Sequence, residues 1–251
     1  MCNGSIMDKL ISFSLPLMVS GILQLAFNAV DIIVVGRFSG SQALAAVGST
    51  TALINVFTNL FIGISLGANV LAARFYAAGK DREMSETVHT SITLALISGI
   101  MMAVIGVLLA KWALEIMGTP DDVIGQSALY MRIYFMGMPF FMLYNYGAAI
   151  LRAIGDTKRP LIFLIISGIA NAALNMILVI LFHMGVAGVA IGTIISQLIS
   201  CVLVLTCLYR SEGSYQLRFS KLKINGAYME QIFQVGVPAG IQSTVINLSN
   251  A

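Results

Sequence analysis

Apolar residues gather into six long runs along this chain, and short segments rich in charged residues separate them. Each run extends over about 20 residues or more, the length that an α-helix needs to cross the ~30 Å hydrocarbon core of a bilayer. The second run is longer than one span requires, so its helix should tilt or project from the membrane. The predicted spans are Ser12–Val35, Leu44–Phe75, Val88–Leu114, Ser127–Ile150, Leu161–His183 and Val186–Tyr209.

The composition agrees with this pattern. Hydrophobic residues make up 58% of the 251 residues and charged residues only 10%, and the mean hydropathy is +0.91. A soluble domain cannot expose so much apolar surface without aggregating. The sequence therefore predicts an all-α integral membrane protein, in contact with membrane lipid.

Lysine and arginine residues alternate between the two sides of the predicted spans. Only Arg37 and Lys111 lie in the connections that follow odd-numbered spans, and Arg132 lies in the first part of the fourth span. The other basic residues precede span one or follow an even-numbered span, namely Lys9, Arg74, Lys80, Arg82, Arg152, Lys158, Arg159, Arg210, Arg218, Lys221 and Lys223. The positive-inside rule then predicts a multi-pass protein of the plasma (bacterial inner) membrane with a cytoplasmic N-terminus. Because these charges are spread over separate loops, the net charge of +3 does not indicate nucleic-acid binding.

A weak internal repeat follows the sixth span. After a polar, basic segment, the stretch VGVPAGIQSTVINLSNA at 235–251 aligns with SLPLMVSGILQLAFNAV at 14–30, which places Pro238 on Pro16 and Asn250 on Asn28. Because six spans separate the two segments, both should cross the membrane in the same direction. This is expected of a transporter built from two parallel repeats. We therefore expect three parts: a six-helix lobe at 1–210, a cytoplasmic linker at 211–233, and at 234–251 the start of a seventh helix. The remaining C-terminal lobe is expected to be missing from this chain.

One carboxylate lies deep inside a span. The chain has 11 Asp and Glu residues, and all except Asp31 lie in loops or near helix ends. A carboxylate at membrane depth costs on the order of 2.5–3.5 kcal/mol on insertion scales, and such groups usually mark an ion or proton path. Asp31 is therefore the first candidate for a functional residue.

Other polar side chains form one stripe on each of several spans. Residues three, four, seven or eight apart share a helix face, so each stripe predicts a polar face directed into the helix bundle. The stripes are Gln24, Asn28 and Asp31 in span one; Asn55 and Asn59 in span two; Ser167, Asn171 and Asn175 in span five; and Thr193, Gln197 and Ser200 in span six. These amides and hydroxyls either line a cavity around Asp31 or join helices by hydrogen bonds.

Other functional classes receive little support. An intramembrane enzyme needs a nucleophile with a base or a cluster of metal ligands, and no His, Cys or second carboxylate is predicted at the depth of Asp31. We therefore expect neither an enzyme nor a bound cofactor. A non-transporting membrane scaffold would explain the helices but not the buried charge.

Several motifs together resemble a known family. VDIIVVGRFSG follows a proline-containing first helix, LRAIGDTKRP lies between spans four and five, NAALN lies in span five, and GVAGVAIGTIISQ lies in span six. In this order and spacing they are similar to the multidrug and toxic compound extrusion (MATE) transporters, over the whole chain as an N-terminal half. The same superfamily holds flippases for lipid-linked oligosaccharides, which remain the alternative function, although a flippase cavity should be more cationic.

The resemblance implies a twelve-helix, two-lobed secondary transporter driven by entry of Na⁺ or H⁺. Because an apolar cavity with a single carboxylate suits an apolar cation, we expect an antiporter that exports organic cations. Asp31 matches the family's coupling-ion or proton site, with Asn171 and Thr193 as matching neighbours and possible oxygen ligands of Na⁺. Asn175 departs from the family pattern because many bacterial members have a second carboxylate there. Asn28, Gln24, Asn55, Asn59 and Gln197 are candidate cavity-lining residues. Pro16 and Pro139 are candidate hinges, since each removes a helix hydrogen bond.

Overall fold

The computed structural model describes residues 6–249 and contains only helices in that range. Its long helices are α1 (Ile6–Phe38), α2 (Gly40–Ala77), α3 (Asp81–Ile116), α6 (Lys158–Asn175), α7 (Gly185–Arg210) and α8 (Gly226–Ser249). The shorter elements are α4 (Asp121–Met136), α5 (Met138–Ala153), the π-helix η1 (Met176–Leu181) and the 3₁₀-helix η2 (Phe219–Lys221). The predicted all-α membrane fold, with a six-span lobe followed by the start of a seventh helix, is confirmed.

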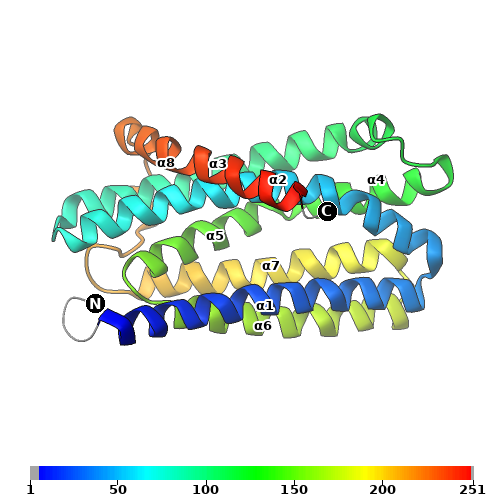
Figure 1. The fold of residues 1–251 in the computed structure, drawn as a ribbon, viewed down its shortest axis with the longest axis horizontal. Helices are drawn as coiled ribbons and strands as arrows, with labels where there is room; N and C mark the ends of the chain where they lie inside the picture. Colours follow the sequence, from blue (N-terminus) through cyan, green and yellow to red (C-terminus); the bar gives the residue numbers. More distant parts are fainter. Residues whose placement is uncertain (1–5, 250–251) are drawn as a thin grey trace.

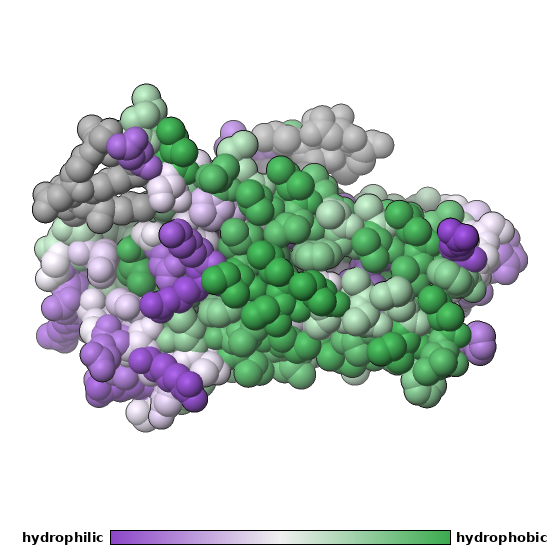
Figure 2. Space-filling model, turned by 90° about the horizontal axis from the view of Figure 1, so that it is seen from below, coloured by the Kyte–Doolittle hydropathy of each residue, from purple (hydrophilic) through white to green (hydrophobic). Residues whose placement is uncertain are grey.

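Five of these helical segments are long and apolar enough to cross a membrane. They include α1, α2, α3 and α7, and the fifth is α6 continued by η1 from Lys158 to Leu181. Polar residues gather at the two ends of the face shown in Figure 2, and a broad apolar band lies between them. This distribution is the one expected of a multi-pass membrane protein.

The fourth span differs from the prediction of one continuous helix over Ser127–Ile150. Its first half, α4, begins earlier, at Asp121, and the helix breaks at Gly137 before continuing as α5. Proline explains the break, because Pro139 lacks the N–H that would bond one turn back. Gly99 of α3 accommodates it: a Cβ there would lie 2.6 Å from Pro139 Cα. The fourth span is thus formed by two 16-residue helices placed end to end.

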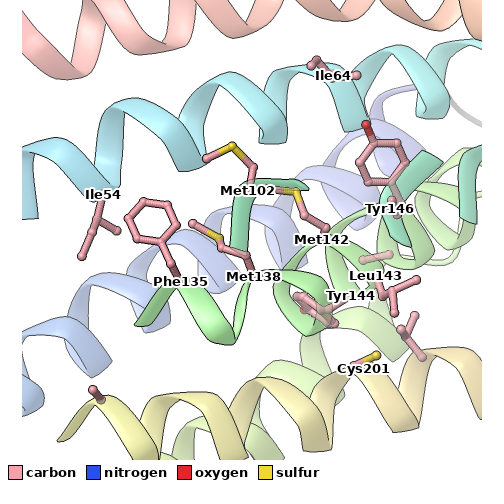
Figure 3. Close-up of a cluster of buried hydrophobic side chains, with 14 of the residues drawn as sticks. Ile54, Ile64, Met102, Phe135, Met138, Met142, Leu143, Tyr144, Tyr146 and Cys201 are labelled. Atoms are coloured by element: carbon pink, nitrogen blue, oxygen red, sulfur yellow. The ribbon is translucent and has the colours of Figure 1, made fainter. Parts of the chain in front are cut away.

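The helices form a bundle with two distinct edges. Figure 1 shows α1, α6 and α7 along one edge, α2, α3 and α8 along the other, and α5 between them. The apolar core lies around the α4–α5 break, where Phe135, Met138 and Met142 point toward Met102 and Ile54 (Figure 3). The Phe57 and Phe135 rings meet edge to face with centroids 5.9 Å apart. Burying these large side chains fixes α2, α3, α4 and α5 relative to one another.

Helix α8 packs along α2 through glycine residues. Gly236 and Gly240 lie four residues apart, as do Gly63 and Gly67 on α2, and all four are buried. A Cβ at Gly236 would lie 2.6 Å from Ile64 Cα, so only glycine permits this backbone contact. Small residues at this spacing are typical of close helix crossings in membranes.

The segment expected to begin a second repeat is helical from Gly226, eight residues before its expected start at 234. Helix α8 runs in the same direction as α1 in Figure 1, as the alignment of Pro238 with Pro16 requires. Asn250, the second residue of that alignment, lies outside the described residues.

Candidate functional site

The polar stripes of four helices meet around one cavity of about 370 Å³. Asp31 lines it from α1, Asn171 from α6 and Thr193 from α7. The predicted lining residues are all present, namely Gln24, Asn28, Asn55, Asn59 and Gln197. The stripes therefore face one another around this cavity, and the roles of the residues stay a prediction.

A chain of hydrogen bonds connects Asp31 to α7. The Asn175 amide Nδ2 donates to Asp31 Oδ1 and, over 3.3 Å, to Asn171 Oδ1. Asn171 Nδ2 in turn donates to Thr193 Oγ1 over 3.4 Å, and Thr193 Oγ1 donates to the Val189 carbonyl over 3.0 Å. The carboxylate of α1 is thus linked through two amides of α6 to a hydroxyl of α7.

Asn175 lies behind the cavity wall rather than in it. Its side chain is fully buried, whereas Asp31 is half-buried. Gly192 of α7 leaves the space for the amide, since a Cβ there would meet Asn175 Oδ1. Within residues 6–249, Asn175 Oδ1 is one of four buried side-chain polar atoms without a hydrogen-bond partner. The Asn175 amide is therefore held in place through its NH₂ group, which donates to Asp31 and Asn171, and not through its oxygen.

Two features of the site have no counterpart in the sequence prediction. The π-helix η1 begins directly after Asn175, and the Phe182 N–H bonds to the Ile177 carbonyl five residues back, over 3.2 Å. Such wide turns recur at functional sites, and no sequence signal predicted this one. Tyr130, Tyr134 and Asn145 also line the cavity. They come from α4 and α5. Because the span is broken between these two helices, a single helical period does not show that the three residues face the same cavity.

The serines of the stripes do not join helices. Ser167 Oγ donates to the Leu164 carbonyl and Ser200 Oγ to the Gln197 carbonyl, in each case within their own helix. Side-chain hydrogen bonds between α6 and α7 instead come from Asn171 with Thr193 and, toward the other end of the helices, from Arg159 with Cys207. Among the described stripe residues, these bonds favour a cavity lining for the serines over a bridging role.

The two candidate hinges lie in different settings. Helix α1 continues unbroken through Pro16, and Ser20 Oγ donates to the Pro16 carbonyl over 2.8 Å. Pro139 instead follows the break between α4 and α5. The structure therefore places one proline inside a continuous helix and the other at a bend, and motion at either residue stays a prediction.

The cavity offers one negatively charged group, the Asp31 carboxylate, surrounded by amide and hydroxyl side chains. Of the described residues that line it, Asp31 alone carries a carboxylate, and none is Lys or Arg. No group of three His, Cys, Asp or Glu side chains within residues 6–249 could hold a metal ion. A carboxylate with amide and hydroxyl oxygens nearby suits a hard cation or a proton, and the tyrosines add an aromatic wall suited to an organic cation.

Known proteins resemble this chain over nearly its full length. The probable multidrug resistance protein YoeA of Bacillus subtilis is 34% identical over 246 residues, which cover 94% of this chain and 53% of that protein. The multidrug export protein MepA of Staphylococcus haemolyticus is 28% identical over 257 residues, which cover 98% of this chain and 56% of that protein. This chain thus spans about half the length of the curated relatives it matches.

The fold has a counterpart among solved structures. The crystal structure of MATE in the bent conformation matches with a TM-score of 0.90 and 22% identity, over 98% of this chain and 55% of that one. A family model described as MatE matches residues 16–177, more than half of the 251 residues. The resemblance to MATE transporters is therefore confirmed, and this chain belongs to the MatE family.

Proposed function

We propose that this chain is the N-terminal lobe of a cation-coupled multidrug antiporter that exports organic cations. The observation that carries the proposal is the hydrogen-bonded series Asp31, Asn175, Asn171 and Thr193 at the wall of the cavity. The names of the relatives, a multidrug resistance protein and a multidrug export protein, support export of drugs, and the single carboxylate of the cavity supports organic cations among them. No bound cofactor enters this mechanism, since the coupling cation is a transported substrate.

In this mechanism, Na⁺ or H⁺ enters from outside and binds at Asp31. A neutral Asn175 supports single-carboxylate coupling, because a proton shared between two carboxylates is excluded at this position. Cation binding removes the negative charge from the cavity, so an organic cation held there loses its counter-charge and is released. Movement of α1 against α6 and α7 then alternates access, together with the second lobe, around a central site.

The orientation follows from the basic residues. We place the N-terminus and the ends of α2, α5 and α7 in the cytoplasm, where the positive-inside rule puts Arg74, Arg152 and Arg210. A flippase for lipid-linked oligosaccharides is less well supported. Its anionic substrate would call for basic cavity residues, and the described lining has none.

Binding of a model organic cation to the purified 251-residue chain tests the proposal. We expect tetraphenylphosphonium to bind in equilibrium dialysis, and Na⁺ or a lowered pH to displace it. The Asp31→Asn variant should bind at least about tenfold more weakly, the loss of about 1.4 kcal/mol. Glu115→Gln, which removes an exposed carboxylate at the end of α3, is the matched control. Unchanged binding by Asp31→Asn would refute the role of Asp31.

A further inference from the structure

The segment between α7 and α8 is folded against the bundle at the end where α3 begins. Leu217 is fully buried, and its N–H donates to the Leu208 carbonyl over 3.1 Å. Phe219 stacks on Tyr209 at a centroid distance of 5.9 Å, and both rings are more than half exposed. Exposed aromatic rings at the end of a span are typical of a membrane–water interface. This segment, residues 211–225, is the inter-helix linker.

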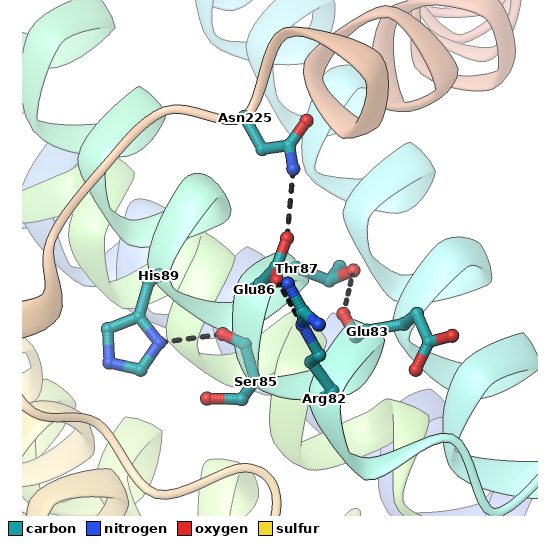
Figure 4. Close-up of polar contacts among 7 residues, drawn as sticks. All are labelled: Arg82, Glu83, Ser85, Glu86, Thr87, His89 and Asn225. Atoms are coloured by element: carbon teal, nitrogen blue, oxygen red, sulfur yellow. Dashed lines mark hydrogen bonds and ion pairs between the residues drawn. The ribbon is translucent and has the colours of Figure 1, made fainter.

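Three side chains of α3 anchor the inter-helix linker. The Arg218 N–H donates to His89 Nε2 over 3.1 Å, and the Asn225 N–H donates to Thr90 Oγ1 over 3.2 Å. Asn225 Nδ2 donates to Glu86 Oε2 over 2.9 Å (Figure 4). These bonds use the backbone of the linker and Asn225, so the lysine side chains of the linker take no part in them.

His89 carries no charge in this arrangement. Its Nδ1 lies 2.6 Å from the Ser85 carbonyl, which can only accept a hydrogen bond, so Nδ1 carries the proton. Its Nε2 accepts from the Arg218 N–H and is therefore unprotonated. The buried ring is the neutral Nδ1–H form, and it adds nothing to the charge around it.

A cavity of about 810 Å³ lies between α3 and the inter-helix linker. Its charged lining comprises Arg82, Lys221 and Lys223 against the single carboxylate of Glu86. Arg82 Nε pairs with Glu86 Oε1 over 3.1 Å. Over the described part of the chain, neither lysine has a carboxylate within ion-pairing distance. Ser85 and Asn225 add uncharged polar groups to the lining, so the cavity has an excess of two positive charges.

We propose that this cavity binds the phosphate group of an anionic phospholipid. Its two unpaired lysines match a phosphate in charge, and hydroxyl and amide groups beside them can donate hydrogen bonds. In the orientation proposed above, the cavity opens at the cytoplasmic surface, where anionic headgroups are available. Basic pockets in this position recognise anionic lipid headgroups. The exposed rings of Tyr209 and Phe219 hold the same linker at headgroup level.

Native mass spectrometry of the detergent-purified 251-residue chain tests this proposal. We expect the chain to retain one phosphatidylglycerol at concentrations where it retains little phosphatidylcholine, which has no net charge. The Lys221→Gln/Lys223→Gln variant should bind phosphatidylglycerol about tenfold or more weakly, because it removes the two lysine charges that attract the phosphate. Because the linker anchors do not use these side chains, its fold should be unchanged, as circular dichroism would show.

A matched variant and a competing ion decide between the explanations. Arg74→Gln/Lys158→Gln removes two exposed charges from other helices at the same membrane face and should retain the lipid. Equal loss in both double variants would overturn the proposal, because general surface charge would then explain binding. Displacement of the lipid by equimolar inorganic phosphate would also overturn it in favour of a free-anion site. Failure of this test would leave the role of Asp31 untouched, because the cavities are separate.

Discussion

A single stripe along α2 changes character halfway along the helix. Asn55 and Asn59 line the cavity that contains Asp31, whereas Gly63 and Gly67, at the same four-residue spacing, contact the backbone of α8. The first half borders an open space and contributes polar side chains to its lining. The second half leaves no room even for a methyl group. The lobe thus combines an open polar wall with a close-packed helix contact.

The largest expected effect comes from Asp31, which lines the cavity. In the two-lobed transporter proposed above, Asp31→Asn should reduce gradient-driven efflux of a fluorescent organic cation to background in proteoliposomes. The reason is that an amide neither takes up a proton nor supplies a counter-charge to Na⁺. Unchanged membrane insertion and thermal stability would show that the fold is intact. Full efflux by this variant would contradict the assignment.

A substitution at the glycine contact should act on stability instead. Gly236→Leu should separate α8 from α2 and reduce the free energy of unfolding by about 1–3 kcal/mol, the usual cost of overpacking. Denaturation of the purified chain in mixed micelles would measure it. Gly48→Leu is the control on α2, because a Cβ at Gly48 meets no atom within 4 Å. Equal stability of the two variants would show that the α2–α8 contact is not close-packed in the membrane.

Asn175 tests whether the polar wall depends on its buried support. Asn175→Leu removes the donor shared by Asp31 and Asn171 and should weaken cation binding by about tenfold, because a lost partner at a buried polar group costs about 1–3 kcal/mol. Asn175→Gln keeps an amide and should restore part of the affinity. Equilibrium binding of ²²Na⁺ or proton uptake would measure both. Equal affinity in Asn175→Leu and wild type would remove Asn175 from the site.

The smallest effect is expected at Ser167. Its hydroxyl bonds only to the Leu164 carbonyl of its own helix among the described contacts, so Ser167→Ala should change stability by less than about 0.5 kcal/mol. Its effect on organic-cation binding should likewise stay within a factor of about two. A larger loss in either assay would show that Ser167 joins helices after all.

The fold and most of the cavity could be predicted from the sequence because hydrophobic runs and helical periodicity both report burial. Asp31 stood out by its cost in a membrane, and Asn171 and Thr193 by their place on polar stripes. Tyr130 and Tyr134 could not be found in this way, since a break at Gly137 redirects their helix. The glycine contact depends on which helices become neighbours, and that information lies in the tertiary packing of α2 and α8. Asn175 was predicted as a site residue, but its place behind the wall depends on the space above Gly192.

The central claim is that Asp31 responds directly to the coupling cation. Difference infrared spectroscopy of the purified chain tests it, with spectra recorded as Na⁺ is added at constant pH and as the pH is lowered without Na⁺. We predict a carboxyl-group band that changes with at least one of these cations in the wild type and is missing from Asp31→Asn, which also decides between Na⁺ and H⁺. Identical difference spectra for the wild type and Asp31→Asn under both conditions would contradict the account.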